Sequence, residues 1–265
     1  MESQNQTMLH LQDITMRFGG VTAIDQLNME VPGKKIVGLI GPNGAGKTTV
    51  FNVITGFYHP QEGAVSFAGQ SLSGLAPRNI CTLGIARTFQ NIRLFAGGTV
   101  LENVMAGCHV RRRSQWWMAP LCLPMFFREE REIRKKSYAL LERLGLGPLA
   151  GEKASSLPYG AQRRLEIARA LATEPSFLLL DEPAAGMNPQ ESGELMRFIR
   201  EVRDEFDLTI LMIEHDMKVV MGVCAHIWVL EYGRLIAEGG PTDIRTNPRV
   251  ITAYLGQEAS ERNHA

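Results

Sequence analysis

Strand-like and helix-like segments alternate along most of this chain. Residues 8–18 and 23–31 look like two strands joined by a pair of glycines, which predicts an antiparallel pair at the start of the fold. The apolar run 36–40 predicts a buried parallel strand, and residues 49–54 predict the first turns of a helix. A short strand is expected over residues 64–67.

The second half of the chain alternates regularly. Its predicted helices are residues 160–172, 189–205 and 217–223, and its predicted strands are residues 177–181, 208–213 and 227–231. Strands alternating with helices favour a parallel sheet that is covered by helices on both faces. The sequence therefore predicts an α/β fold.

Residues 90–156 have a different, helical pattern. Val100, Val104 and Met105 have helical spacing. Residues 128–144 predict a charged helix, and the apolar positions of this helix are Ile133, Tyr138, Leu141 and Leu144. One or two helical turns are expected just before this region, over residues 77–83. The pattern predicts a helical insertion within the α/β chain.

Charge and composition restrict the kinds of partner. The chain has 265 residues with 28 basic and 28 acidic side chains, so no net field draws it to nucleic acid or to an anionic membrane. Arg111-Arg112-Arg113 is the candidate for a local basic patch. Four widely spaced cysteines and a polar N-terminus fit a reduced, intracellular chain. Residues 116–127 are too short to span a bilayer, so we expect any role in a membrane process to be exerted from outside it.

The segment Gly41–Thr48 has the spacing of a phosphate-binding loop between a strand and a helix. Such a loop aims several backbone N–H groups at one point, and the helix N-terminus adds its positive end. Lys47 could then reach the β- and γ-phosphates, and the Thr48 hydroxyl could bind Mg²⁺. A glycine-rich turn that precedes Lys-Thr by chance is disfavoured, because all these parts are in register. The sequence predicts binding of a nucleoside triphosphate.

Three further segments carry candidate chemistry. Asp181 and Glu182 follow an apolar strand, where an aspartate can hold Mg²⁺ through water and a glutamate can polarise an attacking water. His215 follows the next strand and could reach the γ-phosphate. Gln90, at the start of the helical insertion, could contact Mg²⁺. Taken alone, His215 fits an ordinary loop histidine and Gln90 a solvated amide.

The order of these motifs resembles that of one family. The motifs are Gly41–Thr48, Gln90, Leu157–Gln162 with the following helix 163–171, Asp181-Glu182 and His215. From about residue 8 to 240 this order is similar to the ATP-binding-cassette (ABC) ATPases. The resemblance implies a RecA-like P-loop core with an antiparallel N-terminal β-subdomain and an inserted helical subdomain. It also implies head-to-tail dimers that hold two ATP molecules between the phosphate loop of one chain and the signature of the other.

The same resemblance assigns roles to residues that match the family motifs. It implies ATP and Mg²⁺ as cofactors, with catalysis by Glu182, His215, Lys47 and Gln90 and metal contacts from Thr48, Gln90 and Asp181. Nucleotide contacts are expected from Phe18, which would stack on adenine, and from Gly41, Pro42, Asn43, Gly44, Ala45, Gly46, Lys47, Thr48, Thr49, Tyr159 and Gly160. The expected parts are an ATP-binding core in two segments (8–89 and 157–240), a helical subdomain (90–156) and a C-terminal extension (241–258).

The signature departs from the family pattern Leu-Ser-Gly-Gly-Gln. Here it is Leu157-Pro158-Tyr159-Gly160-Ala161, and Pro158 offers neither the hydroxyl nor the N–H of the family serine. Proline also suits the first turn of a helix, which is the structural alternative. We therefore expect an asymmetric heterodimer with a related ATPase, in which the site capped by Pro158 hydrolyses ATP more slowly; a homodimer is the alternative.

Several strings resemble the branched-chain amino-acid (LivG-type) subfamily more narrowly, including residues 49–56, Arg87–Gln90, residues 181–186 and the terminal Asn247–Gly256. This implies import of branched-chain amino acids with two integral-membrane permeases and, indirectly, a solute-binding protein. The chain would be cytoplasmic and peripheral on the inner face of the membrane. Urea, amide and lipopolysaccharide systems use near relatives and remain alternatives for the transported solute.

Two functions other than transport fit this sequence less well. A soluble cassette ATPase that acts on DNA, ribosomes or cofactor assembly is disfavoured by the neutral charge and the lack of a basic arm, and we expect no nucleic-acid partner. A switch GTPase is disfavoured because its Asn-Lys-x-Asp motif is absent. Residues 108–128, which are rich in aromatic and basic side chains, could help to dock the membrane subunits or form a surface loop, and the loop is slightly favoured.

Overall fold

A computed structural model describes residues 7–111 and 124–254 of the chain. The strands are β1 (Thr7–Phe18), β2 (Val21–Pro32), β3 (Ile36–Ile40), β4 (Glu62–Phe67), β5 (Gln70–Ser71), β6 (Ile85–Arg87), β7 (Phe177–Asp181), β8 (Thr209–Ile213), β9 (His226–Glu231) and β10 (Arg234–Gly239). The α-helices are α1 (Lys47–Ile54), α2 (Pro77–Leu83), α3 (Val100–Cys108), α4 (Pro124–Arg143), α5 (Tyr159–Leu171), α6 (Pro189–Glu205), α7 (Met217–Val223) and α8 (Pro241–Thr246). Short 3₁₀ turns occur at His109–Arg111, Gly147–Leu149 and Ala154–Ser156.

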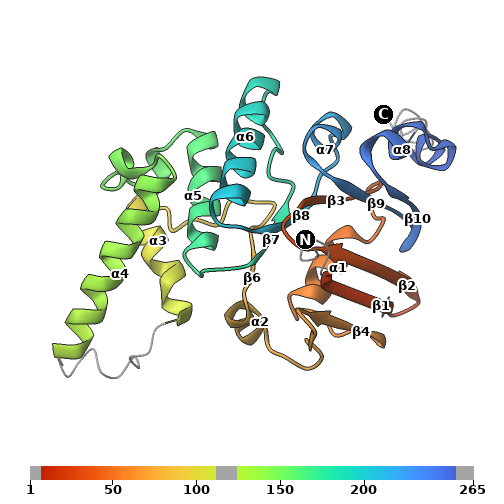
Figure 1. The fold of residues 1–265 in the computed structure, drawn as a ribbon, viewed down its shortest axis with the longest axis horizontal. Helices are drawn as coiled ribbons and strands as arrows, with labels where there is room; N and C mark the ends of the chain where they lie inside the picture. The colour runs from red at the N-terminus through yellow and green to blue at the C-terminus, as the bar shows by residue number, and fades with distance from the viewer. Residues whose placement is uncertain (1–6, 112–123, 255–265) are drawn as a thin grey trace, which may run out of the picture.

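A six-stranded sheet in the order β10-β9-β3-β8-β7-β6 forms the centre of the molecule (Figure 1). All neighbouring pairs are parallel except β9 and β10. Every residue of β3, β7 and β8 is buried, as expected for apolar strands that are covered on both faces. The predicted α/β fold is confirmed.

Side-chain alternation divides the interior of the protein into two hydrophobic cores. Leu178 and Leu180 of β7 join the core that the helices α3 to α7 cover. Phe177 and Leu179 point to the other face, where they join the core beneath α1 and β1. Since successive strand residues point to opposite faces, the same five-residue run fills both cores.

A second, antiparallel sheet has the order β2-β1-β4-β5. The expected N-terminal hairpin is present, with Phe18 paired to Val21 at its turn. The inward residues of this hairpin, including Leu9, Leu11 and Ile24, are fully buried in the core that also contains Phe51 of α1. The hairpin therefore packs beside the helix that follows the glycine-rich loop.

The helices α3, α4 and α5 lie together at one end of the molecule (Figure 1). Helix α3 begins at a capping box, in which Thr99 and Glu102 satisfy each other's backbone N–H groups. Tyr138, predicted as one of the apolar positions of α4, does not join the core, because the residue is 47% exposed. Ser137 takes the buried position, four residues after Ile133, while the Tyr138 hydroxyl pairs with Glu142 near solvent.

Several elements were not predicted. Strand β6 has three residues and too little sequence for a pattern, while β10 is a half-exposed edge strand that pairs antiparallel with β9.

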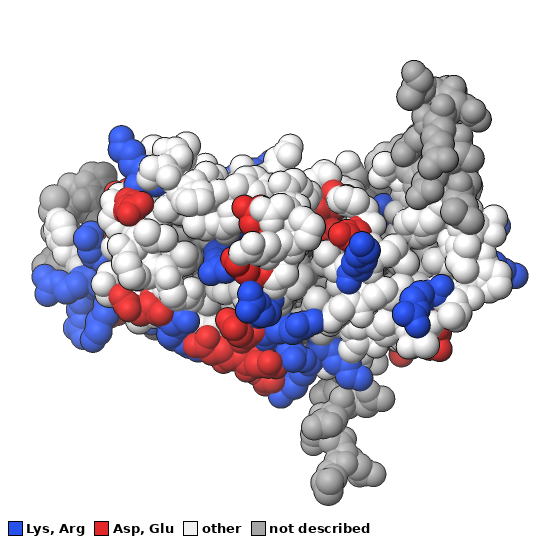
Figure 2. Space-filling model, turned by 90° about the horizontal axis from the view of Figure 1, so that it is seen from above, with Lys and Arg blue, Asp and Glu red and all other residues white. Residues whose placement is uncertain are grey.

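Among residues 7–111 and 124–254, no helix combines the length and the apolar composition that crossing a bilayer requires. The aromatic stretch Trp116–Trp117 lies outside the described residues. On the face shown in Figure 2, basic and acidic side chains are interspersed.

Candidate nucleotide-binding and catalytic site

The loop between β3 and α1 is pressed against the neighbouring backbone. A Cβ atom on Gly41 would lie 2.1 Å from the Leu230 carbonyl oxygen, and one on Gly46 would lie 2.5 Å from the Ala23 oxygen. Their φ angles of 153° and 101° are also ones that side chains disfavour. Only glycine fits at these two positions, so the loop keeps its backbone close to β9 and to the N-terminal hairpin.

Helix α1 offers an anion-binding end. Its N-cap residue, Gly46, makes no side-chain cap, so the first N–H groups of the helix have neither an intrahelical acceptor nor a capping side chain. The Lys47 ammonium donates hydrogen bonds to the carbonyl oxygens of Gly41 at 2.7 Å and Pro42 at 2.9 Å. Burial lowers the pKa of Lys47, while the carboxylates of Glu182 and Asp181 act in the opposite direction. Free N–H groups beside a buried cation fit a polyphosphate.

Asp181 ends strand β7 with its carboxylate almost fully buried. Arg87 donates to Asp181 Oδ2 at 2.8 Å and to Asn52 Oδ1 at 2.7 Å, which ties the ends of β6 and β7 to α1. The described residues contain no cluster of three or more His, Cys, Asp or Glu that could hold a metal. Mg²⁺ is commonly held by one or two carboxylates and the phosphates of a nucleotide. Asp181 and the exposed hydroxyl of Thr48 therefore fit Mg²⁺ that arrives with a nucleotide.

Glu182 is the residue at which three segments converge. Its Oε2 atom accepts a hydrogen bond from Gln90 Nε2 at 3.0 Å and lies 3.5 Å from His215 Nδ1. Its φ of 46° is an unusual backbone conformation, and its N–H donates to the Ile213 oxygen at 2.9 Å. The structure thus brings together Gln90, Glu182 and His215, which the sequence predicted separately.

Glu214 is a buried acid that sequence reasoning did not single out. Its Oε1 accepts the Ala184 N–H at 2.8 Å, and its side chain is only 1% exposed. Desolvation raises the pKa of Glu214 above its ordinary value of 4.5. The signal available in the sequence was an acidic residue directly after the apolar run of β8.

The burial of Glu214 predicts a pH-dependent effect on stability. Because the folded state holds its proton more tightly than the unfolded state, stability falls as pH rises from 4.5 through the raised pKa. Glu214→Gln keeps the acceptor for Ala184 and removes the charge. We expect the variant to gain about 1 kcal/mol of unfolding free energy over the native chain between pH 4.5 and pH 8. Urea unfolding at both pH values measures this; a difference that does not grow with pH contradicts it.

The predicted signature residues lie away from the loop of their own chain. Helix α5 lies among the helices at the left of Figure 1, whereas α1 lies in the right half. Tyr159 is 42% exposed, and its hydroxyl donates to the Ala185 oxygen at 2.9 Å. Pro158 is the N-cap of α5, with no side-chain cap, and a Cβ atom added to Gly160 would meet no atom within 4 Å. The structure does not bring Tyr159 and Gly160 to Gly41–Thr48 within one chain.

Phe18 is available for the predicted stacking on adenine, and Tyr254 lies at the base of the nucleotide loop. Phe18, at the end of β1, is 42% exposed and meets Tyr58 edge to face, with ring centroids 5.1 Å apart. The hydroxyl of Tyr254, which sequence reasoning missed, is buried near the Gly41 N–H. Burial raises the pKa of Tyr254 to about 12. Its ring packs on the helix-covered core, so the C-terminal region reaches the base of the loop.

Comparisons with known proteins agree with this geometry. The model of the ABC transporter family matches residues 24–185, and a second model, branched-chain amino acid ATP-binding cassette transporter, matches residues 234–260. The high-affinity branched-chain amino acid transport ATP-binding protein LivG of Escherichia coli (strain K12) is 47% identical over 253 residues, which are 96% of this chain and 99% of LivG.

Solved structures have the same fold. The ADP conformation of MJ1267, an ATP-binding cassette of an ABC transporter, superposes with a TM-score of 0.83 at 32% identity and covers 95% of this chain and 99% of its own. A dimeric post-hydrolysis state of the cassette MJ0796, bound to ADP and Pi, has a TM-score of 0.72 at 25% identity, over 88% of this chain and 99% of its own. By family model, sequence identity and fold, the chain belongs to the ABC transporter family of ATP-binding proteins, in the group that includes LivG.

Proposed function

We propose that this chain hydrolyses ATP to drive an importer of branched-chain amino acids. The observation that carries the ATPase is the Glu182 carboxylate, held by Gln90 and close to His215 beside the phosphate loop. The substrate class rests on the 47% identity to LivG and on the C-terminal match at residues 234–260.

The site residues divide the work of hydrolysis. Residues Gly41–Thr49 would hold the triphosphate through backbone N–H groups and the Lys47 ammonium, and Phe18 would stack on adenine. Thr48, Asp181 and Gln90 would hold Mg²⁺, which supplies neutralisation of the phosphate charge when bound. Glu182 is the acceptor that would orient and polarise water, and His215 would contact the γ-phosphate.

Two ATPase chains would complete each site. Helix α5 begins at an exposed end, where Tyr159 and the partly exposed Gly160 would face a neighbouring chain. The MJ0796 cassette is a dimer in its post-hydrolysis state, which supports pairing here. We propose a heterodimer with a related ATPase, in which the site capped by Pro158 is the slower one.

The Pro158 hypothesis has a direct test. Pro158→Ser restores a hydroxyl and an N–H at the helix end and is expected to raise the ATPase rate of the assembled complex about threefold, the worth of one added hydrogen bond. A site-resolved ATPase assay in which neither site changes would contradict the asymmetry.

A groove lined by residues from α2, β6, α3 and α5 would receive the permeases. A cavity of about 440 Å³ is lined by Phe57, Arg78, Phe89, Phe95, Glu166 and Arg169. Phe57 and Phe95 are 56% and 61% exposed, which is typical of an unoccupied docking surface. We propose two integral-membrane permeases as partners, a solute-binding protein acting through them, and a position on the inner face of the cell membrane.

The chain would be divided into an ATP-binding core, a helical subdomain and a C-terminal extension. Residues 8–89 and 157–240 would form the ATP-binding core, residues 90–156 the helical subdomain, and residues 241–258 the C-terminal extension. The described helices of the middle part are α3 and α4.

Uptake of a labelled substrate tests the function. Cells that lack this chain are expected to lose uptake of labelled leucine and to regain it with the native gene but not with Glu182→Gln. Uptake of labelled urea in the same cells is the control for the related transporters. Leucine uptake that does not depend on this chain, or urea uptake that does, would contradict the proposed substrate class.

A further inference from the structure

A buried ion pair lies within helix α5, away from the phosphate loop. Arg163 and Glu166 are each 1% exposed and one helical turn apart, and Arg163 Nη1 donates to Glu166 Oε2 at 2.9 Å. A buried ion pair is weak evidence for stability, because the desolvation of both charges offsets their attraction. Its other contacts are therefore more informative about its role.

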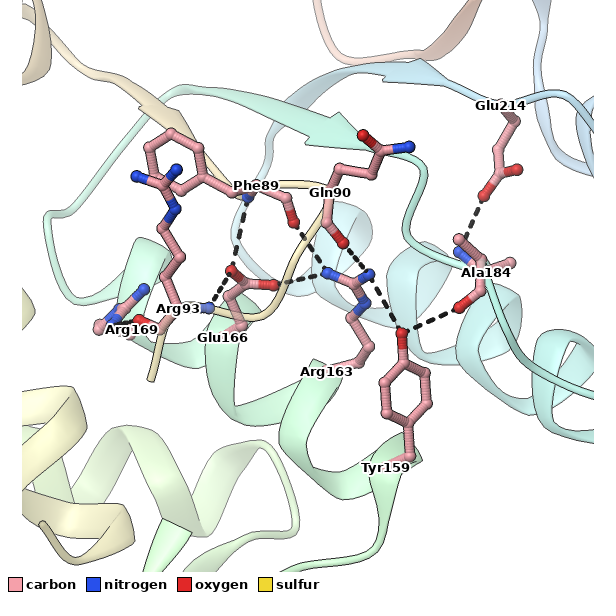
Figure 3. A network of polar contacts seen from close by, with 10 residues as sticks. Phe89, Gln90, Arg93, Tyr159, Arg163, Glu166, Arg169, Ala184 and Glu214 are labelled. Atoms are coloured by element: carbon pink, nitrogen blue, oxygen red, sulfur yellow. Dashed lines mark hydrogen bonds and ion pairs between the residues drawn. The ribbon is translucent and has the colours of Figure 1, made fainter. Parts of the chain in front are cut away.

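The pair holds the backbone that carries Gln90 (Figure 3). The Arg163 guanidinium donates to the carbonyl oxygens of Phe89, at 2.9 Å, and of Gln90. On the same segment, Glu166 Oε1 accepts the N–H groups of Phe89 and Arg93 at 3.5 Å and 3.4 Å. The positive Arg163 thus binds carbonyl groups of the Gln90 segment, and the negative Glu166 binds N–H groups of the same segment.

The other side of the network reaches the segment after Glu182. Arg163 Nη2 lies 3.4 Å from the Tyr159 hydroxyl, which in turn donates to the Ala185 oxygen at 2.9 Å. The neighbouring Ala184 N–H is held by Glu214, as Figure 3 shows. One face of α5 therefore contacts both segments that fix the surroundings of Glu182.

We propose that Tyr159, Arg163 and Glu166 are positioning residues that hold Gln90 and the Ala184–Ala185 segment in register with Glu182. This rests on the proposed ATPase function and assigns residues that act on the hydrolysis rate rather than on ATP affinity. None of the three contacts the loop Gly41–Thr48 in this chain. Phe89 and Glu166 also line the 440 Å³ groove, so a partner in the groove would bear on the same unit.

Arg163→Gln and Arg164→Gln form a matched pair of variants. Arg164 is the next residue on α5, but its guanidinium stacks on Phe198 at 5.3 Å instead of contacting the Gln90 segment. In the complex assembled with its partner ATPase, Arg163→Gln is expected to lower kcat about tenfold, because small displacements of catalytic groups are costly. Its affinity for ATP should stay within about twofold, and Arg164→Gln should match the native chain in both.

Two additional readouts separate positioning from general stability. Hydrogen exchange of the backbone amides of residues 89–93 should speed up in Arg163→Gln and not in Arg164→Gln, with or without ATP. Tyr159→Phe removes only the hydroxyl, so it should fold normally and still lower kcat about threefold, as the loss of one hydrogen bond implies. Arg163→Lys should not rescue, because an ammonium lacks the planar fork of donors.

The outcomes are distinct. The inference is overturned if kcat of Arg163→Gln stays within about twofold of the native rate, if ATP affinity falls together with kcat, or if exchange at residues 89–93 is unchanged. Failure of the native complex to hydrolyse ATP would instead refute the proposed function. In that case, the exchange experiment would still decide whether the pair holds the Gln90 segment.

Discussion

Glu182→Gln lowers the rate of ATP hydrolysis by a factor of about 10³ while ATP binding is retained, as expected for loss of a general base. The glutamine keeps the size of the side chain and one oxygen that can accept from Gln90, but it cannot take a proton from water. Since the phosphate loop is unchanged, we expect the affinity for ATP to stay the same.

Release of inorganic phosphate under single-turnover conditions measures this effect, and filter binding of labelled ATP measures the affinity. Glu205→Gln is a suitable control, because this carboxylate at the end of helix α6 pairs instead with Arg143 of helix α4. A variant that keeps more than about a tenth of the native rate would show that Glu182 is not the principal base.

Arg87→Met lowers the free energy of unfolding by about 3 kcal/mol, because it leaves the Asp181 charge buried without its partner. The side chains of this pair are only 8% and 5% exposed, and Arg87 also supplies the hydrogen bond to Asn52. Methionine fills much of the same volume, so the loss comes chiefly from the unpaired carboxylate.

The matched control is Arg17→Met. Arg17 pairs with Glu62 at 2.7 Å, as closely as Arg87 with Asp181, but these side chains are 46% and 53% exposed. Exposed pairs are worth less than about 1 kcal/mol. Urea unfolding of both variants at neutral pH makes the comparison; equal losses would mean that burial of Asp181 does not matter.

The sequence alone was sufficient to predict the elements and site residues that are marked by a local pattern. The apolar runs at β3, β7 and β8 predicted the parallel sheet, and the glycine spacing predicted the loop at Gly41. Glu182 and His215 were located because each follows such a run, and parallel strands place their ends at one edge.

Other features depend on contacts between distant segments. Strand β6 is too short to have a pattern of its own and exists because it pairs with β7. The roles of Arg163 and Glu166 could not be predicted, since charged residues on a helix are ordinarily exposed and their burial depends on the Gln90 segment. Tyr138 was misplaced because apolar spacing alone does not account for its hydroxyl group.

Titration calorimetry of the purified full-length chain with ATP tests the central claim, that the Gly41–Thr48 loop holds a nucleotide in the presence of Mg²⁺. We expect one ATP per chain for the native protein and at least about tenfold weaker binding for Lys47→Ala, which lacks the ammonium that would bind the phosphates. Absence of binding to the native chain, or equal affinity in Lys47→Ala, would contradict the assignment of this loop.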